Sequence, residues 1–229
     1  MSIPYRIKIC GIRTKKDVDI VLKAQPDAIG FIVGAKHVTE DEVSPEFVKS
    51  VIVDIPNHIT PVLVTHLVKS SEILNLADKC QINCIQLHSE ITVKEIETII
   101  KKAPYLTLIK AFHANIPNSI SLIPEYKHLI SAIILDTASN GRVGGTGKTH
   151  DWKVSYKIVK SSHLPIILAG GLTPDNVKFA ILQVNPYAVD VNSGVEDENG
   201  NKDLNKIRSF ISNAQQSFAN INRQKYAFK

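Results

Sequence analysis

A glycine-rich stretch, "GRVGGTGKTHDW" at residues 141–152, has the residue types of a phosphate-binding loop. A nucleotide-binding P-loop requires the spacing G-x-x-x-x-G-K-[ST], in which backbone N–H groups hold a chain of phosphates. Counting back from Gly147-Lys148-Thr149, the first glycine of that motif should stand at position 142, where the chain has Arg142. The spacing therefore argues against a P-loop and leaves the glycines available for another kind of phosphate.

A thiol and a carboxylate each stand at the end of an apolar run: Cys10 in "KICGI" and Asp136 in "IILDT". An isolated buried cysteine usually only packs, and a loop aspartate usually caps a helix. Here the position after a strand favours acid–base chemistry for both. Lys8 lies two residues before Cys10, hence on the same face of a strand, where its charge would favour a thiolate. Cys80 and Cys84 have no second pair of ligands, so they do not predict a metal site.

Eight short apolar runs recur along the chain with amphipathic segments between them. They are rich in Ile, Val and Leu without strict alternation, which is typical of parallel strands covered on both faces. The predicted strands are 6–12, 28–33, 60–66, 84–88, 107–113, 132–137, 165–171 and 188–194.

Helix start signals lie between these strands: Thr14, Ser44 before Pro45, and Thr173 before Pro174. Eight strand–helix units without a dividing linker predict a single (β/α)₈ barrel domain over residues 1–229, with a short C-terminal tail from about 217. A doubly wound sheet is the alternative, but the turn after the first strand lacks its glycine fingerprint.

Seven of the 11 glycines follow the sixth, seventh and eighth predicted strands. Loops after strands seven and eight of such barrels commonly bind phosphate, because glycine lets the backbone approach an anion closely. The glycines therefore favour one sugar phosphate over a nucleotide triphosphate.

The net charge of +5 and pI near 9.0 come from scattered lysines, without a block of like charges. This pattern favours an electropositive site mouth over nucleic-acid binding. No apolar run reaches the length of a membrane span, and "MSIPYRIKICGIR" lacks the features of a secretory signal. Three cysteines argue against a disulfide framework, so we expect a cytoplasmic protein.

Five motifs in order give the chain a strong resemblance to the phosphoribosylanthranilate isomerase family. They are "KICGI" (8–12), "QLH" (86–88), "GGTGKTHDW" (144–152), "LAGGLTPDNV" (168–177) and "VDVNSGVEDENGNKD" (189–203). The resemblance runs from Lys8 to about Ile211. It implies a (β/α)₈ barrel that converts N-(5-phosphoribosyl)anthranilate to its 1-deoxyribulose form by an Amadori rearrangement, in tryptophan biosynthesis, without metal or organic cofactor.

The resemblance also implies roles for individual residues. Cys10 matches the general base and Asp136 the general acid. The phosphate-binding candidates are Gly145, Gly147, Gly170, Gly171, Ser193 and Gly194. Arg13, Lys36, His88 and Asp190 are candidates for orienting the substrate, although Asp190 could equally pair with a lysine inside the barrel.

The chain departs from the family in the segment after the second strand, which usually carries Ser-Pro-Arg with an arginine for the anthranilate carboxylate. Here it reads "GAKHVTEDEVSPEF" (34–47), without arginine; Lys36, His37, Arg13 and Arg142 are the possible substitutes. This difference leaves two alternatives open: an isomerase for another phosphorylated amino sugar, or a non-catalytic barrel that binds a phosphorylated metabolite. The family includes monomers and dimers, and the sequence is compatible with a monomer or a homodimer.

Overall fold

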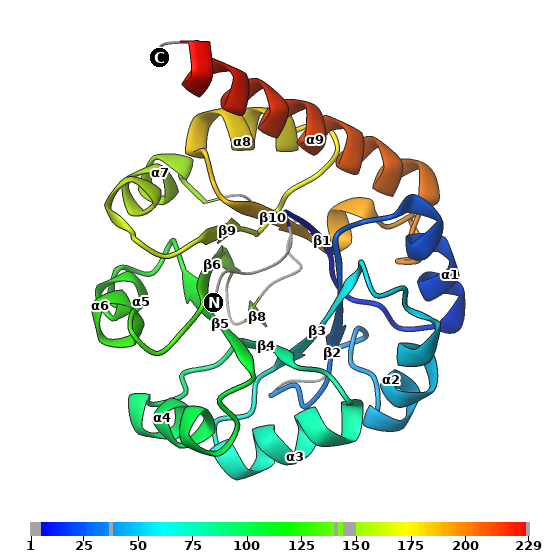
Figure 1. The fold of residues 1–229 in the computed structure, drawn as a ribbon. Helices are drawn as coiled ribbons and strands as arrows, with labels where there is room; N and C mark the ends of the chain where they lie inside the picture. The colour runs from blue at the N-terminus through cyan, green and yellow to red at the C-terminus, as the bar shows by residue number, and fades with distance from the viewer. Residues whose placement is uncertain (1–5, 37–38, 140–141, 144–149, 228–229) are drawn as a thin grey trace.

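In the computed structural model, eight parallel strands close into a barrel, and helices form a ring around it (Figure 1). The structure describes residues 6–36, 39–139, 142–143 and 150–227. Within them the order around the barrel is β1-β10-β9-β6-β5-β4-β3-β2. The barrel strands are β1 (Ile7–Ile9), β2 (Ala28–Ile32), β3 (Thr60–Thr65), β4 (Cys84–Leu87), β5 (Thr107–His113), β6 (Ala132–Asp136), β9 (Ile166–Leu168) and β10 (Ala188–Val191). The predicted (β/α)₈ barrel is confirmed, with strand ends trimmed by a few residues.

The helices follow the strands as the sequence indicates. They are α1 (Lys15–Ala24), α2 (Pro45–Val51) with the 3₁₀ turn η1 (Ile52–Asp54), α3 (Ser70–Cys80), α4 (Val93–Lys102), α5 (Pro117–Ser121), α6 (Ile123–Tyr126), α7 (Trp152–Ser161), α8 (Val177–Val184), the 3₁₀ turn η2 (Ser193–Val195) and α9 (Leu204–Ala227).

Two predicted helix starts are confirmed and one lies later. The Thr14 side chain accepts the N–H of Asp17 in a capping box, and Ser44 caps α2 ahead of Pro45. At Thr173 the same reciprocal pair is present: the N–H of Thr173 donates to Oδ1 of Asn176, and the N–H of Asn176 donates to Oγ1 of Thr173. The N–H of Val177 donates to the Thr173 carbonyl, and the regular helix α8 begins at Val177.

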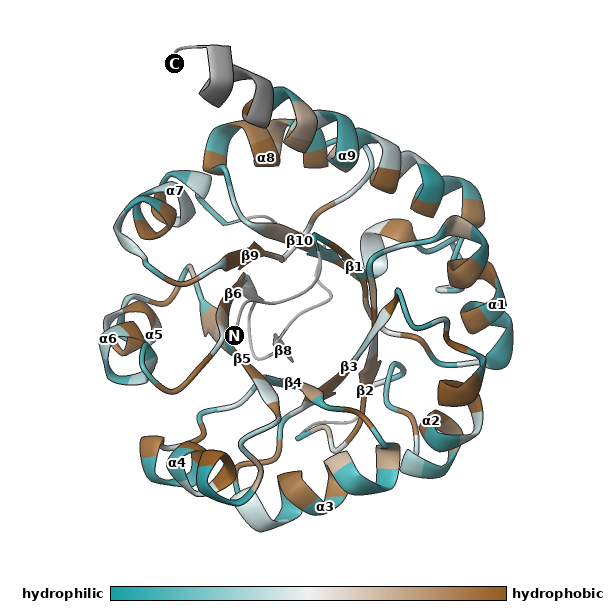
Figure 2. Ribbon diagram, viewed as in Figure 1, coloured by the Kyte–Doolittle hydropathy of each residue, from teal (hydrophilic) through white to brown (hydrophobic). Residues whose placement is uncertain are grey.

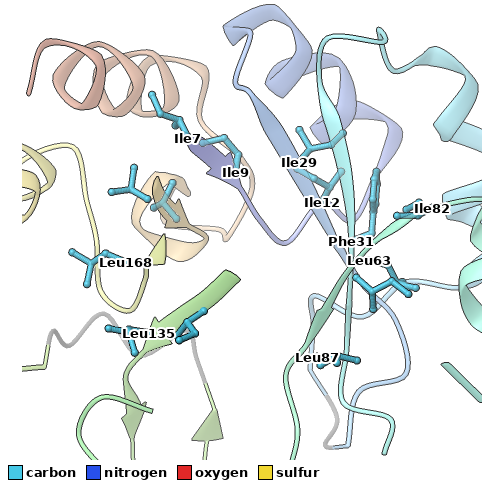
Figure 3. Close-up of a cluster of buried hydrophobic side chains, with 14 of the residues drawn as sticks. Ile7, Ile9, Ile12, Ile29, Phe31, Leu63, Ile82, Leu87, Leu135 and Leu168 are labelled. Atoms are coloured by element: carbon cyan, nitrogen blue, oxygen red, sulfur yellow. The ribbon is translucent and has the colours of Figure 1, made fainter. Parts of the chain in front are cut away.

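Alternation along the strands divides the buried side chains between two faces. Outward residues such as Ile7 and Ile9 pack with the helices in one large cluster, part of which Figure 3 shows. The helices turn their hydrophobic faces inward toward it (Figure 2). A second cluster, which is made of strand residues and residues directly after them, fills the interior and includes Cys10, Cys84 and Ile134. Residues in phase with these therefore face the barrel interior.

The barrel closes where the first strand meets the last one. Ile7 pairs with Val189 and Ile9 with Val191. Helix α9 covers this closure and runs on to Ala227, so the segment expected as a tail from about residue 217 is helical, and Phe218 is buried.

A short antiparallel ribbon after β6 was not predicted. It joins β7 (Ala138–Ser139) to β8 (Arg142–Val143) within the glycine-rich segment. None of the helices in the described ranges is long and apolar enough to cross a membrane.

Candidate active site

Lys8 and Cys10 lie together on the interior face of β1, as their spacing predicts. Gly30 of β2 lies beside both side chains: a Cβ added to Gly30 would stand 2.7 Å from the Cys10 sulfur and 2.9 Å from Cε of Lys8. This glycine therefore makes the space for both side chains. A glycine inside a strand is a signal of close approach, which could have drawn attention to Gly30.

Lys8 is fully buried, and its charge is balanced inside the barrel. Its ammonium donates to Asp190 Oδ2 at 2.8 Å and to Gln86 Oε1 at 2.9 Å. Burial opposes the charge, but Asp190 and Cys10 outweigh burial and raise the pKa of Lys8 above its ordinary value. The lysine pairing considered for Asp190 is thus present. The other oxygen, Oδ1, is buried without a hydrogen-bond partner among the residues described.

Cys10 stays a thiol at neutral pH. Burial raises the pKa of the Cys10 thiol to about 11, although Lys8 lowers it in part. The helpful charge expected from Lys8 is present, but burial is the larger effect.

Asp136 ends β6 and meets His88 across the interior. His88 Nε2 lies 3.4 Å from Asp136 Oδ2, and both side chains are about 90% buried (8% and 10% exposed). The other ring nitrogen, Nδ1, lies 3.0 Å from Nε2 of Gln86. Because Gln86 also binds Lys8, a continuous series of polar contacts joins Lys8 on β1 to Asp136 on β6 through Gln86 and His88.

The surroundings of Asp136 favour its ionised carboxylate. Burial favours the neutral acid, but hydrogen bonds from His88 and from the backbone N–H of Thr137 outweigh it and lower the pKa of Asp136. A general acid needs a raised pKa, so that shift must come from a bound substrate. Gly170 adopts φ +84°, and a Cβ there would lie 2.8 Å from Asp136 Oδ1.

The predicted phosphate loops come together after β9 and β10. A Cβ on Gly194 would overlap the carbonyl oxygen of Leu172, so the two loops touch at the backbone. Gly171 has φ +69° and its carbonyl accepts from Asn176, and Ser193 opens η2. Gly145 and Gly147 lie outside the described residues.

Arg13 is held at the mouth beside β1. It donates to the carbonyl of Gly200, and its Nε lies 3.8 Å from Oδ1 of Asp41. Oδ2 of Asp41 accepts from Asn192 at 2.8 Å. The segment after β2 thus presents an aspartate, paired with Arg13, in place of an arginine. Lys36 is exposed, and His37 lies outside the described residues.

Two histidines that the sequence reasoning missed flank His88. The rings of His66 and His113 meet it edge to face, with centroids 5.3 and 5.9 Å away. They follow or end the adjacent strands β3 and β5, in phase with the interior residues. A polar residue in phase with an apolar interior face is the signal that could have identified them, and Gln86 as well.

The fold and this site define a class: a (β/α)₈ barrel with a thiol and a carboxylate facing the interior at the carboxyl ends of its strands, where such enzymes place their active sites. In the residues described, no group of histidine, cysteine, aspartate or glutamate side chains could hold a metal ion.

Comparison with known proteins narrows the class. The family model of N-(5'-phosphoribosyl)anthranilate isomerase matches residues 7–213. A relative from Methanosarcina mazei, N-(5'-phosphoribosyl)anthranilate isomerase 2, is 41% identical over 94% of this chain and 96% of its own length. The phosphoribosylanthranilate isomerase crystal structure from Thermotoga maritima has a TM-score of 0.80 and 33% identity, covering 93% of this chain and 99% of that one. The chain belongs to the phosphoribosylanthranilate isomerase family.

A further solved structure of the family contains a ligand. It holds the reduced form of 1-(o-carboxyphenylamino)-1-deoxyribulose 5-phosphate and matches this chain with a TM-score of 0.78 and 31% identity, covering 93% of this chain and 99% of that one.

Proposed function

We propose that this protein isomerises N-(5'-phosphoribosyl)anthranilate to 1-(2-carboxyphenylamino)-1-deoxyribulose 5-phosphate, a step of tryptophan biosynthesis. The observation that carries the proposal is the pairing of a thiol, Cys10, with a carboxylate, Asp136, on the interior face of the barrel in a chain of this family. The strands β10 and β9 stand between β1 and β6, so the two groups approach a central substrate from different sides.

The reaction needs one proton given and one removed. Asp136 protonates the furanose ring oxygen, which opens the ring to a Schiff base, and Cys10 takes the proton from the neighbouring carbon. Only the thiolate form of Cys10 can take this proton, and the charge of Lys8 favours that form by lowering the pKa of the thiol in part. The negative charges of the substrate raise the pKa of Asp136 on binding, which offsets the effect of His88.

The substrate phosphate binds between the loops after β9 and β10, at Gly170, Gly171, Ser193 and Gly194, with Gly145 and Gly147 from the loop after β6. Backbone N–H groups supply most of the donors, and Ser193 adds a hydroxyl. Ser193→Ala then raises KM more than it lowers kcat, because phosphate contacts bind substrate and transition state alike.

Arg13 is the first candidate for the anthranilate carboxylate, because its Nε has no hydrogen-bond partner among the residues described and lies 3.8 Å from Oδ1 of Asp41. Lys36 is the second candidate. If the carboxylate binds Arg13, Arg13→Gln raises KM at least tenfold while Lys36→Gln leaves KM unchanged. The reverse result assigns the carboxylate to Lys36. We expect a monomer or a homodimer, acting on a small molecule in the cytoplasm.

The decisive experiment follows the fluorescence loss of freshly generated phosphoribosylanthranilate on adding the purified protein. Cys10→Ala and Asp136→Ala should each lower kcat at least 100-fold, the usual minimum contribution of a general acid or base. Cys84→Ala is the matched control, since Cys84 is equally buried in the interior but lies at the start of β4. A folded wild-type protein without turnover would overturn the proposal.

A further inference from the structure

Gln86 lies inside the barrel with both ends of its side chain engaged. It is 2% exposed, in the third position of β4. Oε1 lies 2.9 Å from the Lys8 ammonium, and Nε2 lies 3.0 Å from Nδ1 of His88. The residues that pair with it on the two adjacent strands, Val64 and Ile109, are apolar, so the amide finds its polar partners only in Lys8 and His88 among the residues described.

The donors and acceptors along this chain have only one consistent arrangement. An ammonium group has donors but no acceptor, so the amide atom beside Lys8 must be the oxygen. The amide nitrogen therefore faces His88 and donates. Nδ1 of His88 must accept with its lone pair, which leaves the ring proton on Nε2.

We propose that Gln86, oriented by Lys8, is a positioning residue that sets the tautomer of His88 so that its Nε2–H points at Asp136. This inference rests on the proposed function, in which Asp136 is the acid. With that tautomer, His88 donates to Oδ2 across 3.4 Å, while the N–H of Thr137 donates to Oδ1 at 2.7 Å. The opposite tautomer would turn a lone pair toward the carboxylate.

Two neighbouring histidines restrict the orientation of the His88 ring, so its tautomer is the property that can still vary. His66 and His113 pack edge to face against His88 and fix the plane of its ring. Burial is the largest cause that lowers the pKa of His113, so this neighbour adds no positive charge at neutral pH. The position of the proton on His88 then depends on its two ring partners, the carboxylate of Asp136 at Nε2 and the amide of Gln86 at Nδ1.

Gln86→Glu provides a sharp test because it keeps the shape and changes the donor. One carboxylate oxygen still accepts from Lys8, while the other now faces Nδ1 and can only accept a hydrogen bond from a protonated Nδ1. Gln215→Glu is the matched control, since it makes the same chemical change on the exposed side of α9. Gln86→Met removes the donor without adding charge and serves if Gln86→Glu fails to fold.

The readout is a long-range ¹H–¹⁵N spectrum of the whole chain labelled with ¹⁵N-histidine, with the His88 signals assigned by His88→Gln. In the wild type and in Gln215→Glu we expect Nδ1 unprotonated and Nε2 protonated. In Gln86→Glu we expect Nδ1 protonated, and in Gln86→Met a smaller fraction of the Nε2–H tautomer than in the wild type. A protonated Nδ1 in the wild type overturns the proposal.

Kinetics connect the tautomer to the reaction. We expect kcat of Gln86→Glu to fall about 10- to 100-fold, the usual cost of losing a residue that orients a ligand or base, with KM within about threefold of the wild type. A changed tautomer with unchanged kcat overturns the positioning role. A wild type without turnover would refute the proposed function, while the spectra would still decide which nitrogen carries the proton.

Discussion

The buried thiol makes a prediction that can be tested apart from catalysis. If burial determines the protonation of Cys10, the rate of its alkylation by iodoacetamide must rise with an apparent pKa far above that of an ordinary cysteine. The rate depends on the thiolate, which is the nucleophile, so its pH dependence reports the pKa even where the thiol is hard to reach.

The magnitude follows from the pKa of about 11 for Cys10. At pH 8 a thiol of that pKa is about 0.1% ionised, against about 24% for an ordinary cysteine of pKa 8.5. Alkylation of Cys10 should therefore be about 200-fold slower than in the unfolded chain, before any further slowing by its 6% exposure.

Mass spectrometry of the peptide that contains Cys10, over pH 7 to 11, gives the rate at each pH. The same peptide in denaturant is the reference. We expect the native rate to rise tenfold per pH unit up to about pH 10 without levelling. A plateau beginning near pH 8.5 would refute burial as the dominant effect and make Lys8 the controlling group.

Three further changes test the packing and charge of the site. Lys8→Met should lower the free energy of unfolding by about 3–5 kcal/mol in urea titrations, because it leaves the Asp190 carboxylate buried without its partner. The double variant with Asp190→Leu should recover part of that loss; if the losses of the two single variants simply add in the double variant, the buried pair is contradicted. Gly194→Ala should lower the free energy of unfolding by about 1–3 kcal/mol because its Cβ meets a backbone carbonyl. Gly200→Ala should cost less, because its Cβ would lie 3.7 Å from the Arg13 guanidinium, an ordinary contact, and only φ +75° strains it; equal losses would argue against the close loop contact. Folded Cys10 holds its proton to higher pH than the unfolded chain, so the free energy of unfolding should fall by up to about 1.4 kcal/mol per unit between pH 8.5 and 11, and Cys10→Ala should reduce that slope; an unchanged slope would contradict the raised pKa.

Local patterns were sufficient for the barrel and for the faces of its strands. The two-residue spacing of Lys8 and Cys10 placed both on one face, and the carboxylate of Asp136 was expected at a strand end. These properties depend on alternation and on apolar runs, which are visible within a few residues of sequence.

Contacts across the barrel interior could not be predicted in the same way. Lys8 binds Gln86 and Asp190, which are 78 and 182 residues away, and nothing local to any of them indicates the partner. The lowered pKa of Asp136 has the same origin, since His88 comes from another strand. The start of α8 at Val177 is a difference of boundary only, since Thr173 and Asn176 form the reciprocal hydrogen bonds of a capping box.

The pairing of β1 with β10 also determines when the site can form during synthesis. Lys8 emerges from the ribosome among the first residues, but its carboxylate partner follows 182 residues later. Until then the lysine would have to enter the interior without its counter-ion, which is costly, so a partial barrel is disfavoured. Joining such distant segments also delays folding, because the loop between them must close first. Nascent or truncated chains that end before β10 should therefore not form a closed barrel. The first and last strands should pair in one late step that assembles the site.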